Sequence, residues 1–294
     1  MLDGVMLLWF VLAACALLFV AIDIRTTPES LVMKWGFVLV TAYTGVVGAF
    51  LYVLGCREPL PGLHEQYVAA QWRQGLGSTM HCVAGDGVGI LAGAVLARVF
   101  GLSGLSEIAL EYALGFAFGW TVFQALFMRN MAGGSYPRSL ARTFIPELLS
   151  MNLLMAGMVP TMKILQTQLG RGADPTTAAF WFVMSMALLV GAIVAYPINW
   201  WLVLYHLKHG MMTVRPQTVS HAVMGATHPA MPGVAMASRH SGQAAHGDKA
   251  QAQTMEGMAM GARMQPRPPV AVMALISFTA LAAGLLIASL AAPT

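Results

Sequence analysis

The sequence has little charge. Of its 294 residues, 10% are Asp, Glu, Lys or Arg, whereas an ordinary soluble domain has about 25%. A water-soluble globule of this size would lack the charged groups to cover its surface. Hydrophobic residues make up 57% of the chain, and the mean hydropathy is +0.68. This composition excludes a soluble enzyme and a disordered chain.

Cysteine is scarce too, and no run of basic residues occurs. Cys15, Cys56 and Cys82 are widely spaced and form no C-x-x-C pair, so neither a zinc ribbon nor a disulfide framework is indicated. The net charge is +4, but without a basic run we expect no nucleic-acid partner. The sequence also has no nucleophile–base pair, phosphate loop or cofactor fingerprint, so no enzymatic activity is indicated.

Apolar residues are instead gathered in long runs. One helical crossing of a bilayer needs about 20 such residues, and the runs are continuous, unlike the alternating strands of a membrane β-barrel. We therefore predict an all-α membrane protein, a bundle of about seven transmembrane helices in the lipid bilayer of a bacterial inner (plasma) membrane. The predicted helices are 5–22, 36–55, 76–99, 107–128, 146–167, 178–203 and 269–291.

A long polar stretch precedes the last predicted helix. Residues 206–268 are rich in Gly, Ala, Pro, Ser and Gln and have almost no aliphatic runs, so they cannot bury a core of their own. We predict three parts: a six-helix membrane core at 1–205, a flexible, disordered loop at 206–268, and a seventh transmembrane helix with the C-terminus at 269–294.

The predicted loop is rich in histidine and methionine. It holds six of the eight His and nine of the 22 Met. Imidazole and thioether groups bind copper, and Met/His tracts without Cys resemble the extracytoplasmic copper-binding segments of bacterial proteins. The alternative is a low-complexity linker. The candidate metal ligands in the loop are His221, His228, His240, His246, Met255, Met258 and Met260.

Polar residues also occur inside the predicted helices. A carboxylate facing lipid costs about 2.5–3.5 kcal/mol on insertion scales, so Asp86 should face the interior of the bundle. Cys82 lies four residues earlier on the same helix face, with His81 beside it. These three side chains form a candidate site for a soft or divalent metal ion. The alternative is an interior Asp bonded to a neighbouring helix, a small apolar Cys and an interfacial His.

A second candidate ligand set begins the predicted helix 146–167. Pro146 fits the first helical turn, and Glu147 then lies near the positive end of the helix dipole. Met151 and Met155 follow on the same face. A Met stripe that starts at a Glu is a candidate path for Cu(I), and packing in the gaps between helices is the alternative.

Three glycines, Gly85, Gly89 and Gly93, recur at a spacing of four. This pattern of small residues predicts that a second helix approaches the helix at 76–99 closely.

Basic residues indicate the orientation. The connections after the second, fourth and sixth predicted helices hold eleven Lys and Arg, against five for the odd-numbered ones. The positive-inside rule therefore places the N-terminus and the long loop in the cytoplasm and the C-terminus outside. Counting helices also places Cys82, Asp86 and Glu147 on the same side of the membrane as the loop.

Several short motifs point to a family. They are Asp23-Ile24-Arg25 with Pro28, His81-Cys82 with Gly85 and Gly89, 115–119 with Gln124, 146–158, 195–201 and 207–211. In these stretches, within residues 5–215, the chain resembles a bacterial integral-membrane family, the domain of unknown function DUF4396. The resemblance implies a helical membrane protein and no particular mechanism. The family often has a second Cys four residues after the His-Cys pair, where this chain has Asp86.

The functional hypothesis from the sequence is copper handling, in which the loop captures ions and passes them to His81, Cys82, Asp86, Glu147 and Met151. One alternative is a structural or assembly subunit that binds other membrane subunits. The other is a proton- or ion-coupled transporter that uses Asp86 and Glu147.

Overall fold

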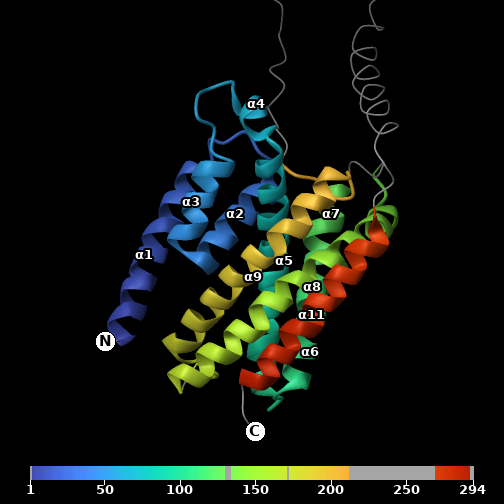
Figure 1. Ribbon diagram of the computed structural model, residues 1–294. Helices are drawn as coiled ribbons and strands as arrows, with labels where there is room; N and C mark the ends of the chain where they lie inside the picture. Colours follow the sequence, from blue (N-terminus) through green and yellow to red (C-terminus); the bar gives the residue numbers. More distant parts are fainter. Residues whose placement is uncertain (1, 130–133, 171, 212–268, 292–294) are drawn as a thin grey trace, which may run out of the picture. The chain divides into compact units, whose positions relative to one another are not determined.

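The protein is described by a computed structural model, which covers residues 2–129, 134–170, 172–211 and 269–291. These residues form helices and connecting segments with no β-strand, which confirms the all-α class. The elements in chain order (Figure 1) are α1 (Leu2–Asp23), α2 (Leu31–Thr44), α3 (Val46–Gly55), α4 (His64–Val68), α5 (Gln71–Val99), α6 (Leu105–Phe118), the π-helix η1 (Gly119–Gln124), α7 (Ala125–Met128), α8 (Tyr136–Leu169), α9 (Ala178–Leu204) and α11 (Val270–Ala291).

Among the described residues, five helices are long and apolar enough to cross a membrane: α1, α5, α8, α9 and α11. Each contains most or all of a run that the sequence predicted to span. The run at 107–128 is also helical, but η1 separates α6 from α7 within it. The protein therefore has the helices of a multi-pass membrane protein.

The prediction of one helix over 36–55 is wrong. The chain breaks at Gly45, whose φ of 58° is a conformation that L-residues rarely adopt. α3 then runs back along α2, so close that a Cβ on Gly48 would lie 2.7 Å from the Cα of Thr41. The tip of this α2–α3 hairpin packs against Ala13, near the middle of α1. The apolar run alone did not reveal this reversal.

The two ends of the hairpin lie together, beside the end of α1. Arg57 pairs with Asp23 through two contacts of 2.8 and 2.9 Å. The hydroxyl of Tyr52 donates to the same carboxylate at 2.7 Å and lies 2.8 Å from the hydroxyl of Thr27. The hairpin therefore enters and leaves the bundle on the side where α1 ends.

The glycine ladder packs as the sequence predicted. α5 crosses α6 so closely that a Cβ on Gly89 would overlap the carbonyl of Leu114, and one on Gly93 would lie 2.7 Å from the Cα of Glu111. Gly85 faces the ring of Phe123 in η1 in the same way. The contacts advance along α5 as they go back along α6, so the two helices are antiparallel.

α8 begins ten residues before the predicted start at 146, so Pro146 and Glu147 lie inside the helix and not in its first turn. α11 packs along α8 in the same direction, because Ser277 donates to the carbonyl of Leu149 at 3.0 Å and Gly284 contacts Ala156. The start of α11 therefore lies at the same end of the bundle as the start of α8 (Figure 1).

Gly89→Leu tests the close crossing of α5 and α6. The added side chain has no room against the backbone of α6, so we expect a loss of about 1–3 kcal/mol or more of stability. The measurement is the midpoint of thermal unfolding in detergent. Gly4→Leu is the matched control, because a Cβ at Gly4 meets no atom within 4 Å. Equal midpoints for the two variants would contradict the crossing.

Candidate functional site

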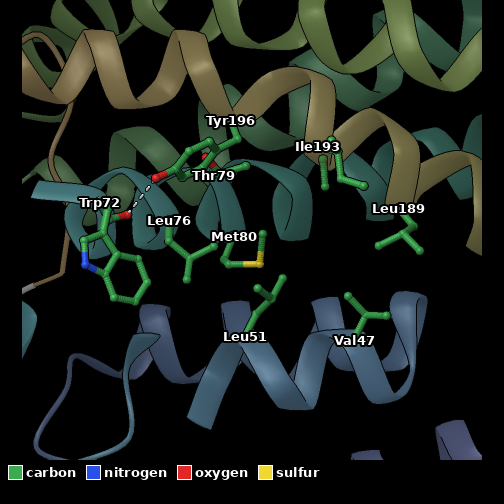
Figure 2. A pocket seen from close by; sticks show the side chains of 10 residues that line it. Val47, Leu51, Trp72, Leu76, Thr79, Met80, Leu189, Ile193 and Tyr196 are labelled. Carbon is green, nitrogen blue, oxygen red and sulfur yellow. Dashed lines mark hydrogen bonds between the residues drawn. The ribbon is translucent and has the colours of Figure 1, made fainter. Parts of the chain in front are cut away.

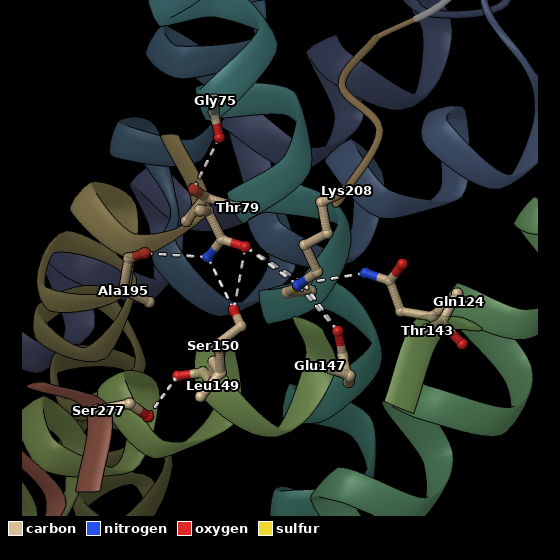
Figure 3. Close-up of polar contacts among 12 residues, drawn as sticks. Gly75, Thr79, Gln124, Thr143, Glu147, Leu149, Ser150, Ala195, Lys208 and Ser277 are labelled. Carbon is tan, nitrogen blue, oxygen red and sulfur yellow. Dashed lines mark hydrogen bonds and ion pairs between the residues drawn. The ribbon is translucent and has the colours of Figure 1, made fainter. Parts of the chain in front are cut away.

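Polar side chains from α5, η1, α8, α9 and the segment after α9 meet inside the bundle (Figure 3). We call this group the Lys208 cluster. Its ionisable members and Asn199 are buried, with exposed fractions between 0 and 4%. The members are Cys82, Asp86, Gln124, Glu147, Ser150, Asn199 and Lys208.

The chain turns sharply after α9 and directs Lys208 into the bundle. The amide of His206 donates to Val203 at 3.0 Å, and the amide of Leu207 donates to Leu202 at 2.9 Å. These two bonds form a Schellman motif, in which the residue after the cap is left-handed and usually Gly. Here that residue is His206, with φ 56°, at a cost of roughly 1–2 kcal/mol. Because of this turn, the chain after α9 does not run away from the core, and the side chain of Lys208 enters the bundle.

The ammonium of Lys208 is the centre of the cluster. It lies 2.9 Å from Oε2 of Glu147 and 3.0 Å from Oδ1 of Asn199, and it contacts Sγ of Cys82. A buried ion pair is tolerable only when further hydrogen bonds replace the lost water. The amide and thiol contacts supply those bonds to Lys208.

The surrounding residues fix these groups in place. The thiol of Cys82 lies 3.3 Å from Oε2 of Glu147 and accepts from Nε2 of Gln124 at 3.1 Å. Nδ2 of Asn199 donates to Oγ of Ser150 at 2.8 Å and to the carbonyl of Ala195 at 2.9 Å. The side chain of Asn199 is thereby oriented with its oxygen toward Lys208.

Asp86 completes the cluster from the side of η1. Its carboxylate lies against Gly119, where a Cβ would overlap Oδ1 of Asp86 and lie 3.0 Å from Oε1 of Glu147. Both carboxyl groups therefore point at a position that only glycine can occupy. The side chain of Asp86 interacts with the carboxyl group of Glu147, and neither of its oxygens is paired with an N–H or hydroxyl donor among the described residues. Two buried carboxyl groups that share one place are costly and are a common mark of a functional site.

The structure brings together three of the predicted metal ligands, Cys82, Asp86 and Glu147. His81 is buried next to them, with its ring edge-on to Phe123 at a centroid distance of 5.4 Å. The ammonium of Lys208 lies between the thiol and Glu147, where a metal ion would need to lie. The described residues therefore do not support copper at this place.

The Met stripe of α8 is part of the hydrophobic core. Met151 and Met155 have no exposed surface. The terminal methyl group of Met151 lies 2.8 Å from the position that a Cβ on Gly115 would take, so it fills the gap between α8 and α6. Packing, the alternative given for the stripe, accounts for these contacts.

The predicted ligands of the loop lie outside the described residues, so copper binding by them stays a prediction. They are His221, His228, His240, His246, Met255, Met258 and Met260.

Four members of the cluster are not among the ligands predicted from the sequence: Gln124, Ser150, Asn199 and Lys208. Lys208 was assigned to the flexible loop at 206–268, although it has Leu207 beside it and Met211 three residues later, and both Lys208 and Met211 are 4% exposed. Gln124 was noted only as part of a motif. A polar side chain within an apolar run needs a partner, and that signal was available for Gln124.

A separate cavity of about 330 Å³ lies between α3, α5 and α9 (Figure 2). It is lined mostly by apolar side chains such as Leu51, Leu76 and Ile193, and the Tyr196 hydroxyl at its edge donates to the carbonyl of Trp72 at 3.2 Å. None of the predicted ligands lines this cavity. Its lining offers no site for a metal ion.

Long apolar helices around a buried ion cluster define a helical membrane protein. Residues 71–208 match the family described as Domain of unknown function (DUF4396). The match runs from the first residue of α5 to Lys208, so it contains the whole Lys208 cluster. This part of the chain is a domain of that family, as the motifs suggested. No curated protein and no solved structure matches the chain.

Lys208→Met tests the buried ion pair. Removing the ammonium leaves Glu147 buried without its counter-charge, which should cost about 3–5 kcal/mol. The measurement is thermal unfolding in detergent. The double variant Lys208→Met, Glu147→Gln should recover much of the loss.

Lys163→Met is the matched control for this prediction. Lys163 pairs with Glu107 at 3.0 Å, but these side chains are 18 and 20% exposed, so we expect a loss of at most about 1 kcal/mol. Equal losses of stability for the two substitutions would show that the Lys208–Glu147 pair contributes no more to stability than a partly exposed pair.

Proposed function

We propose that the protein moves protons across a membrane, alone or coupled to a co-substrate, and that the Lys208 cluster is its proton-binding site. The observation that carries the proposal is the carboxyl group of Asp86, which is buried against the carboxyl group of Glu147, itself paired with Lys208, and has no N–H or hydroxyl donor among the described residues. Ionisable groups inside a membrane bundle are expensive and commonly mark proton or ion pathways.

The charges of the cluster support a proton as its ion. Asp86 and Glu147 offer two negative charges, and Lys208 offers one positive charge. A buried site of this kind is neutral when one of the carboxyl groups holds a proton. Release of that proton leaves a net negative charge, which favours uptake of another proton or a shift of Lys208. Exchange between these two states is the chemistry that proton transfer requires.

The helices around the cluster have irregularities that suit movement. The π-helix η1 provides Gly119 and Gln124, and π-helical turns are frequent at functional sites. Pro146 precedes Glu147 within α8, and Pro197 lies two residues before Asn199 in α9. A proline inside a helix removes one backbone hydrogen bond. The regular backbone hydrogen bonding of η1, α8 and α9 is therefore interrupted next to the cluster.

We also infer six crossings in place of the predicted seven. The crossings are α1, α5, the α6–η1–α7 unit, α8, α9 and α11, and the α2–α3 hairpin is re-entrant. The contacts of Tyr52 and Arg57 with Asp23 support this arrangement, because they hold both ends of the hairpin at one end of α1. Under it, the start of α1 and the end of α11 are on the same side.

With six crossings, Lys and Arg are divided more unequally between the two sides than with seven. The inferred side of the N-terminus also changes. Outside the cluster, seven of the nine described Lys and Arg lie on the side where α1 ends, and that side faces the cytoplasm by the positive-inside rule. The start of α1 and the end of α11 then face outward. The seven residues are Arg25, Lys34, Arg57, Arg73, Arg129, Arg138 and Arg142, and the other two are Arg98 and Lys163.

Proton movement can be measured with purified protein in liposomes that contain a pH-sensitive dye. A potassium diffusion potential, negative inside, drives protons inward, with or without a small-molecule cell extract outside to supply a co-substrate. We expect lumenal acidification by the wild type and at least a ten-fold slower rate for Asp86→Asn, which cannot bind the proton. Glu107→Gln, in the partly exposed pair, should keep the rate. Wild-type protein that acidifies no faster than empty liposomes under both conditions would contradict the proposal.

Labelling with a membrane-impermeant maleimide tests the six crossings. Thr26→Cys and Pro61→Cys should label from one side, because both positions line the same surface cavity, and Ala173→Cys should label from the other. Each is placed in a Cys15→Ser background, since Cys15 is the one exposed cysteine. If 36–55 crossed the membrane as one helix, positions 26 and 61 would label from opposite sides.

A further inference from the structure

A second cluster of ionisable side chains lies at the base of the α2–α3 hairpin, outside residues 71–208. It consists of Glu29, Cys56 and His64, and one potential ligand atom from each lies within 4.8 Å of the others. Glu29 is 5% exposed, and the other two have no exposed surface. The three side chains come from three separate segments and converge in a buried place.

The fold explains the convergence. Glu29 lies just before the N-cap of α2, and Cys56 directly follows α3. Because the hairpin reverses at Gly45, these two residues meet although they lie 27 positions apart in the chain. His64 is the first residue of α4, which returns the chain toward the same place.

The ligand set fits one class of ion. Thiolate, imidazole and carboxylate are the protein ligands of Zn²⁺, and three of them leave a fourth position for water or a substrate atom. Ca²⁺ and Mg²⁺ prefer oxygen ligands alone. The charges of one thiolate and one carboxylate equal that of a divalent cation, so a buried site of this composition is neutral.

Neighbouring groups orient two of the three ligands, His64 and Glu29. Nε2 of His64 lies 3.0 Å from the carbonyl oxygen of Cys56. A carbonyl only accepts, so Nε2 carries the proton and Nδ1 is the metal-binding nitrogen. The amide of Ser30 donates to Oε2 of Glu29 at 3.1 Å, and Oε1 of Glu58 accepts from the amide of His64 at 3.3 Å. Such outer contacts are typical of metal ligands.

A surface cavity of about 300 Å³ is lined by residues that are close in the chain to this place. It is lined by Thr27, Arg57 and Glu58, among others, and Arg57 directly follows Cys56 in the chain. We propose that Glu29, Cys56 and His64 bind a Zn²⁺ ion, which fastens the base of the α2–α3 hairpin. The ion joins the segment before the hairpin, the segment after it and α4.

Cobalt is the probe for this site, because Co²⁺ replaces Zn²⁺ and a thiolate ligand adds a charge-transfer absorption band. The full chain is purified without a His tag, treated with chelator and titrated with Co²⁺. We expect the band to saturate at one ion per chain and to disappear on addition of Zn²⁺. His and Met side chains elsewhere in the chain lack a thiolate and do not produce this band.

Cys56→Ser should abolish the band, and Cys15→Ser, the matched control in α1, should keep it. Zn²⁺ should raise the thermal midpoint of the wild type and of Cys15→Ser. If Cys56→Ser does not fold, Glu29→Gln replaces it, and its affinity for Zn²⁺, measured against a competing chelator, should fall at least ten-fold. No thiolate band in the wild type, a band kept in Cys56→Ser, or unchanged affinity in Glu29→Gln would overturn the proposal.

Discussion

The pairing of Lys208 with Glu147 is the interaction on which the arrangement of the bundle depends. Two opposite charges buried in the bundle are stable only if each is held close to the other and to further polar groups. The sharp turn after α9, the orientation of Asn199 by Ser150, and the thiol of Cys82 all serve this requirement. The polar core therefore constrains α5, α8 and α9 together.

Close helix packing supplies the rest of the constraint. Gly119 lets two carboxyl groups point at one place, and Gly89 brings α6 against α5. Each glycine removes a side chain where backbone or carboxylate atoms need the room. Methionines of α8 fill the irregular gaps that remain. The methionines of α8 are thus explained by packing, which uses the flexibility of this side chain.

Much of the fold could be predicted from the sequence, because long apolar runs reflect the thickness of a bilayer directly. The close approach at Gly89 also followed from spacing alone. The break at Gly45 did not, since an apolar run has the same composition whether it crosses or turns back. Asp86 is predicted because a carboxylate in apolar surroundings is costly, and Cys82 because it lies four residues earlier on the same helix face. Glu147 is predicted from its place near the start of an expected helix. Lys208 was missed because its burial depends on a left-handed turn at His206, a residue seldom found in that conformation.

The most direct test of the central claim is the infrared absorption of the carboxyl groups. If the Lys208 cluster is neutral with one bound proton, the wild type at neutral pH shows the carbonyl stretching band of a protonated, buried carboxylic acid, and Asp86→Asn removes that band. Glu111, another buried acid, is unchanged in both proteins and cancels in the difference spectrum. A wild type without such a difference band would mean that Asp86 and Glu147 are both ionised, and would contradict a proton-binding site.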